Sequence, residues 1–154
     1  MRSAPVTARL RTALNQADLL PLTPILHPDV HWSVHDSDRA GCHGRAEVLT
    51  RLAALHQHGG RVAMEETFTY PDAVVLGIGL SREGAPKRGR PQTVYTVFHL
   101  SGGLITRIHG HGDRYTALDA AYSASIHPHA RPAPPATPAA DTDTGGTADR
   151  RGAA

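Results

Sequence analysis

The strongest strand pattern in the chain is a pair of β-branched segments separated by Ser101-Gly102-Gly103. A short glycine-rich spacing between two such segments is typical of a β-hairpin. If all three residues form the loop, Leu100 lies opposite Leu104, and residues of equal parity share one face. A two-residue loop would mix apolar and basic residues on one face, so the pattern favours the three-residue loop. The predicted strands are Gln92–Leu100 and Leu104–Asp113.

The two faces of this hairpin differ in polarity, and we expect the even-numbered face to line a core or a pocket. In this register Tyr95 lies opposite His109 on the odd-numbered face. The even face carries Val94, Thr96, Phe98, Leu100, Leu104, Thr106, Ile108 and Gly110. The odd face carries Thr93, Tyr95, Val97, His99, Ile105, Arg107, His109, His111 and Asp113.

Before the hairpin, the spacing of apolar residues predicts helices mixed with strands. Val6, Leu10 and Leu14 recur every four residues, as on the apolar side of a helix. A second helical segment contains Pro21 and Pro24, and because a proline inside a helix removes a donor, this helix should be short or distorted. The other predicted elements are a strand at Val30–Val34, a turn-like segment at Asp36–Gly44, a helix at Arg45–His56, strands at Val62–Tyr70 and Ala73–Leu80, and a helix at Tyr115–Tyr122.

Length and composition predict one domain followed by a tail. The 154 residues suit a domain at 1–122, whereas residues 123–154 contain interspersed proline, alanine, aspartate, threonine and glycine. No aromatic residue follows Tyr122, so this tail buries little apolar area and we expect it to be disordered. The single cysteine excludes an internal disulfide, and no apolar segment is long enough for a signal peptide or membrane span. We therefore expect a cytoplasmic protein without a membrane partner.

The charge pattern gives little support for a nucleic-acid partner. The formal net charge is only +2, and four basic residues and one glutamate gather in the predicted loop 81–90. Nucleic-acid binding needs a broader basic face with stacking aromatic residues, and neither is visible. We expect a solvated loop at 81–90; the alternative is an anionic partner for that loop.

The order of helices, a strand, a helix and a run of antiparallel strands is an α+β pattern. Five segments carry a more specific signal, and they are Leu14–Leu19, His27–Trp32, Gly44–Val48, Val97–Ile105, and Asp113–Tyr115 with Ala117-Leu118. In this order they resemble the nuclear transport factor 2-like superfamily, in its ketosteroid isomerase and SnoaL-like branch. The resemblance covers roughly residues 6 to 122. It implies a curved antiparallel sheet wrapped around a cone-shaped pocket, about three helices in the N-terminal half, and often a dimer.

The resemblance also allows the family's catalytic positions to be placed on this chain. The general-base aspartate of the steroid isomerases falls on Val34, their oxyanion tyrosine on Leu10 and their oxyanion acid on Thr96. The inward acid of the related epoxide hydrolases falls on Gly110. Because Leu10 and Val34 cannot transfer protons, the steroid isomerase machinery is absent. The family's pocket-lining positions, which imply a cavity for a hydrophobic small molecule, fall on Trp32, Val34, Thr96, Phe98, Ile108 and Gly110.

Two of the candidates for acid or base chemistry, Asp36 and His35, follow the predicted first strand. Asp36 shares parity with Trp32 and Val34, so in one interpretation it lies at the pocket mouth as an acid or base. In the other, it only begins the turn Asp36-Ser37-Asp38.

The remaining candidates, His109 and His111, alternate on one strand with Asp113. This spacing can bind a transition metal, but the resembled family usually works without one, so we expect no metal and no cofactor. A bulge at Gly110 or Gly112 would turn one histidine inward as an acid or base. The register itself favours an outer or dimer face.

The sequence leaves two functions open. The first is a SnoaL-like small-molecule protein, a cofactor-independent isomerase, cyclase or dehydratase acting on a hydrophobic, polyketide- or steroid-like substrate. The second is a non-catalytic ligand-binding or dimerisation module that has lost the family's acids. The resemblance also implies a homodimer through the outer sheet face, where Tyr95, Val97 and Ile105 are the expected contact.

Overall fold

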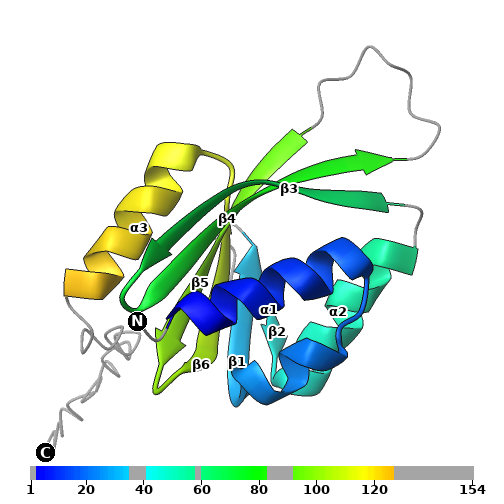
Figure 1. Ribbon diagram of the computed structural model, residues 1–154, viewed down its shortest axis with the longest axis horizontal. Coiled ribbons are helices and arrows are strands. Elements are labelled where there is room, and N and C mark those ends of the chain that lie inside the picture. Colours follow the sequence, from blue (N-terminus) through cyan, green and yellow to red (C-terminus); the bar gives the residue numbers. More distant parts are fainter. Residues whose placement is uncertain (1–2, 35–40, 58–59, 83–91, 127–154) are drawn as a thin grey trace, which may run out of the picture.

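The computed structural model describes residues 3–34, 41–57, 60–82 and 92–126 (Figure 1). These residues form an α+β domain around one curved six-stranded sheet, in the strand order β2-β1-β6-β5-β4-β3. The elements in chain order are α1 (Ser3–Gln16), the 3-10 helix η1 (Leu20–Ile25), β1 (Leu26–Val34), β2 (Cys42–His43), α2 (Arg45–Gln57), β3 (Gly60–Tyr70), β4 (Ala73–Arg82), β5 (Gln92–Ser101), β6 (Leu104–His111) and α3 (Arg114–Ile126).

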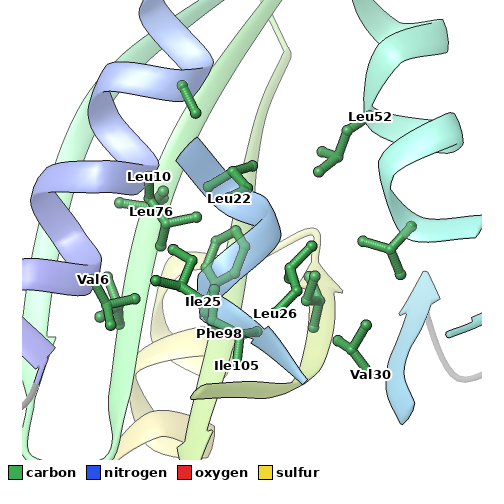
Figure 2. Close-up of a cluster of buried hydrophobic side chains, with 14 of the residues drawn as sticks. Val6, Leu10, Leu22, Ile25, Leu26, Val30, Leu52, Leu76, Phe98 and Ile105 are labelled. Carbon is green, nitrogen blue, oxygen red and sulfur yellow. The ribbon is translucent and has the colours of Figure 1, made fainter. Parts of the chain in front are cut away.

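The helices form two layers, one on each face of the sheet. We call inner the face that packs against α1, η1 and α2, and outer the face covered by α3 (Figure 1). The main apolar core lies at the inner face, where Leu10, Leu22 and Phe98 meet in Figure 2. A second, smaller core on the outer face joins α3 to β4 and β5. In the described residues, none of the helices is long and apolar enough to cross a membrane.

The α+β class and the curved sheet are confirmed, but the sheet is mixed rather than purely antiparallel. β1 pairs with β6 in parallel, with Trp32 opposite Ile108 and Ser33 opposite His109. The strand β2, which the sequence suggested was part of a turn, extends the sheet beyond β1 by pairing His43 with His31. All other neighbouring strands are antiparallel.

The second helical segment is short and distorted, as its prolines predicted. It is the 3-10 helix η1, with Pro21 in its first turn and Pro24 inside it. A 3-10 helix is the form that short helical pieces commonly take. The first strand begins at Leu26, four positions earlier than expected, and its pairing with β6 is irregular between Leu26 and His31. Pro28 has no N–H for a ladder, which accounts for an irregular pairing there.

The predicted three-residue hairpin loop is wrong. Ser101 pairs with Leu104, so the loop is Gly102-Gly103, with φ angles of +60° and +83°. Two positive φ values are what a tight two-residue hairpin turn requires, and glycine adopts them without steric cost. The pairing then shifts by one residue between His99 and Leu100.

Beyond this shift, residues of equal parity share a face, as predicted. Between the shift and the turn, residues of opposite parity are paired. Phe98 pairs with Ile108, whereas Tyr95 lies opposite His111 and not opposite His109 as expected. Ile105 pairs with Leu100 and is fully buried in the inner core, instead of lying on the outer face.

Helix α3 covers the part of the outer sheet face formed by β4 and β5, and this corrects the expected dimer contact. Val97 is fully buried in the outer core together with Ala117 and Ala121 of α3. With Ile105 in the inner core, two of the three expected contact residues are therefore inaccessible to a second copy. The helix itself continues to Ile126, four residues past its expected end, and residues 127–154 lie outside the described residues.

Candidate ligand-binding site

A cavity of about 250 Å³ lies between α2 and the inner face of the sheet. Its walls are predominantly apolar, because β4, β5 and β6 each direct alternate apolar side chains to this face. The cavity is lined by Leu14, Trp32, Arg51, Leu52, His56, Val62, Ile78, Leu80, Val94, Thr96, Phe98 and Ile108.

Four of the six residues expected in the pocket line this cavity: Trp32, Thr96, Phe98 and Ile108. A fifth, Gly110, is buried opposite Thr96 and does not line it. Val34 ends β1 opposite Gly110, and its side chain lies outside the described residues. At Thr96 the wall carries a hydroxyl where the steroid isomerase acid was placed by resemblance.

Arg51 brings a positive charge into the cavity wall. Its guanidinium carbon lies 5.2 Å from the centroid of the Trp32 ring, within the range of a cation–π interaction. Its Nη1 donates a hydrogen bond of 3.4 Å to Cys42 Sγ. Because Cys42 pairs with Trp32 across β1 and β2, the strand register brings both contacts of Arg51 to the same place.

His56 also lines the cavity, and sequence reasoning missed it. Its Nε2 is buried and has no hydrogen-bond partner among the described residues. The signal was present in α2, since Val48, Leu52 and His56 are spaced by four residues and therefore share one face of the helix. A buried polar atom without a partner costs about 1–3 kcal/mol, so such an atom in a cavity wall calls for an explanation.

His109 and His111, expected as possible catalytic residues, lie on the face of the sheet opposite the cavity. Ser33 Oγ and His109 Nδ1 are 2.6 Å apart and share a hydrogen bond. The rings of His109 and His111 have centroids 4.5 Å apart. The register of β6 is continuous from Arg107 to His111, so no bulge turns either ring inward. The inward orientation considered from the glycines is therefore wrong.

The other two candidates, Asp36 and His35, lie outside the described residues. In the ranges that are described, no three histidine, cysteine, aspartate or glutamate side chains lie close enough to hold a metal ion.

His99 lies on the same side of the sheet as His109 and His111 and is partly buried. Burial, together with the nearby charges of Arg107, His109 and His111, lowers the pKa of His99 to about 4. The imidazole of His99 is therefore neutral at physiological pH.

Solved structures of proteins described as nuclear transport factor 2-like share this fold. A protein of unknown function from Mesorhizobium loti with this fold aligns with a TM-score of 0.60 at 18% identity, covering 71% of this chain and 89% of its own. A provisionally named ketosteroid isomerase from Kribbella flavida aligns with a TM-score of 0.59 at 14% identity, covering 71% and 76%. A provisionally named polyketide cyclase from Sinorhizobium meliloti aligns at 0.55 and 18%, covering 70% and 94%. At these identities the similarity is one of fold.

Comparison of the sequence with protein-family models identifies the family of this chain. The model of the SnoaL-like domain matches residues 7–108, and the chain belongs to this family. Among proteins of curated function, no sequence matches this chain.

Proposed function

We propose that this protein binds a small hydrophobic molecule in the cavity between α2 and the inner sheet face. The observation that carries the proposal is the largely apolar cavity, with Trp32, Phe98 and Ile108 in its wall. Ligand pockets commonly measure about 300–1,000 Å³ and are lined mainly by apolar and aromatic side chains with a few polar groups. At about 250 Å³ the cavity suits a molecule of one or two rings, such as a small polyketide-like ring system, better than a larger ligand.

We further propose that the bound molecule is a substrate for proton transfer without a cofactor, as in an isomerase, cyclase or dehydratase. Asp36 and His35 stay the first acid or base candidates by sequence, because they follow directly on β1, whose Trp32 lines the cavity. The alternative is a ligand-binding module without catalysis. Its support is that Leu10, Val34, Thr96 and Gly110 stand where the resembled enzymes carry their catalytic groups.

The experiment uses a neutral two-ring ketone, α-tetralone, and the fluorescence of Trp32, the single tryptophan of the chain. We expect α-tetralone to change Trp32 emission saturably, and the variant Ile78→Phe, which adds volume to the cavity wall, to abolish that change. Far-ultraviolet circular dichroism checks that the variant is folded. If α-tetralone leaves the wild-type emission unchanged, and calorimetry detects binding neither of α-tetralone nor of 4-tert-butylbenzoate or its amide, the proposed ligand site is wrong.

Catalysis is tested on the same complex by deuterium exchange. In heavy water, a protein base takes the proton from the carbon next to the ketone, and a deuteron returns to that carbon. Exchange faster than in buffer supports proton transfer, and its loss in Asp36→Asn assigns the base. Binding without faster exchange supports the non-catalytic module.

Two further expectations stay predictions. The cytoplasmic location rests on the single cysteine, and the homodimer rests on the family resemblance. A dimer would need a surface other than Val97 and Ile105, since both are buried within one chain. Sedimentation of the purified protein measures its oligomeric state directly.

A further inference from the structure

The polar groups of the cavity are unevenly distributed. The sheet contributes apolar side chains and the hydroxyl of Thr96, whereas α2 contributes both Arg51 and His56. Among the described lining residues none is a carboxylate. A ligand with one polar end would therefore place that end toward α2 and its apolar body against Phe98 and Ile108.

His56 indicates that the polar end of the ligand carries a hydrogen-bonding oxygen. His56 lines the cavity, and its Nε2 is buried and lacks a partner in the described part of the chain. Leaving such an atom unpaired is costly, whereas a ligand oxygen at hydrogen-bonding distance would remove that cost on binding. A purely hydrocarbon ligand would leave the imidazole nitrogen unpaired.

Arg51 indicates the charge of that oxygen. A guanidinium stays protonated at any physiological pH and pairs with planar anionic groups such as carboxylates. Stacking on Trp32 and the hydrogen bond to Cys42 Sγ hold this charge in the wall. In an apolar cavity an opposite charge interacts more strongly than it does in water.

We infer that the cavity selects a small cyclic acid, with its ring against Phe98 and Ile108 and its carboxylate at His56 and Arg51. This inference rests on the proposed function, because it names the chemical class of ligand for the same cavity. It assigns His56 and Arg51 as the residues that determine specificity.

The test compares two probes of nearly equal shape, 4-tert-butylbenzoate and its neutral amide 4-tert-butylbenzamide, by isothermal titration calorimetry. We expect wild-type protein to bind the acid at least about tenfold more tightly than the amide, as for a hydrogen bond to a charged group. His56→Leu and Arg51→Met should each remove most of this preference. The conservative variants His56→Gln and Arg51→Lys should retain part of it.

Matched controls lie on the other face of the sheet. His43→Leu and Arg107→Met make the same chemical changes at exposed positions away from the cavity, and they should leave the acid preference unchanged. Circular dichroism on every variant separates loss of binding from loss of folding. If His56→Leu or Arg51→Met does not fold, the conservative variants His56→Gln and Arg51→Lys still test the acid preference.

The outcomes separate this inference from the proposed function. Equal affinity for the acid and the amide, or an acid preference that survives in all four cavity variants, overturns the inference and leaves the apolar ligand site standing. No binding of α-tetralone or of either benzoyl probe overturns the ligand site itself, and the inference with it.

Discussion

The environment of His99 predicts that the protein loses stability as the pH falls from about 6.5 to about 4. Burial is the main reason that the pKa of His99 is lowered to about 4, and the charges of Arg107, His109 and His111 act in the same direction. The unfolded chain takes up a proton at this histidine near its ordinary pKa of 6.5, before the folded chain does. Protonation between these two values therefore favours the unfolded state.

The size of the effect follows from the shift of this pKa. Each unit of pKa difference between the folded and unfolded states corresponds to about 1.4 kcal/mol, so the full effect at pH 4 is on the order of 3 kcal/mol. Above pH 6.5 this loss is absent, because His99 is neutral in both the folded and the unfolded state. A loss of this order is a large part of the ~5–15 kcal/mol by which domains are commonly stable.

Urea unfolding followed by circular dichroism measures this effect between pH 8 and pH 4. The quantity that isolates His99 is the free energy of unfolding of the wild type minus that of His99→Gln, since other titrating groups contribute to both. We expect this difference to fall by about 1–3 kcal/mol from pH 7 to pH 4. The variant His43→Gln, at an exposed position, is the control for the histidine-to-glutamine change itself. A wild-type minus His99→Gln difference that does not change with pH would refute the reasoning.

Three further changes test the core, the hairpin turn and the outer face. Leu10→Ala, at a side chain only 2% exposed in the inner core, should lower the free energy of unfolding by about 2–5 kcal/mol in urea titration, and a loss well below this would contradict its packing. Gly103→Ala should cost about 1–2 kcal/mol by the same measurement, because φ is +83° while an added Cβ meets no atom within 4 Å; an unchanged stability would argue against this turn. The hydrogen bond that the Tyr95 hydroxyl donates to Glu66 raises the pKa of Tyr95 above its ordinary 10.0, so Tyr95→Phe should remove from a spectrophotometric titration a phenol that ionises above this pKa.

The sequence predicted the cavity face of the hairpin correctly although the predicted loop was wrong. Two departures offset each other: the loop is one residue shorter than expected, and the pairing shifts by one residue beside Leu100. Phe98 and Ile108 therefore share the inner face as parity predicted, while Ile105, which lies before the shift, does not follow the prediction. Polarity patterns average over a strand, so they do not locate a single-residue shift.

Long-range pairing and isolated polar residues were the harder parts of the prediction. Nothing local in β1 indicates that it pairs in parallel with a strand near the end of the domain. His56 was accessible to sequence reasoning through its four-residue spacing from Leu52, but a histidine at a helix end is commonly solvated. Whether such a residue faces solvent or a cavity depends on the packing of α2 against the sheet, which the helix sequence alone does not specify.

The parallel pairing of β1 with β6 also has a consequence for the order in which the chain folds. Ser33 and His109, which hydrogen bond across these strands, are separated by 76 positions in the sequence. Closing so long a loop is entropically costly, and pairings between distant segments slow folding. Among the described strands β1 neighbours β2 and β6, and β2 is two residues long, so β1 has no longer strand to pair with until β6 exists. During synthesis, the inner core and its cavity therefore close only after β6 has left the ribosome.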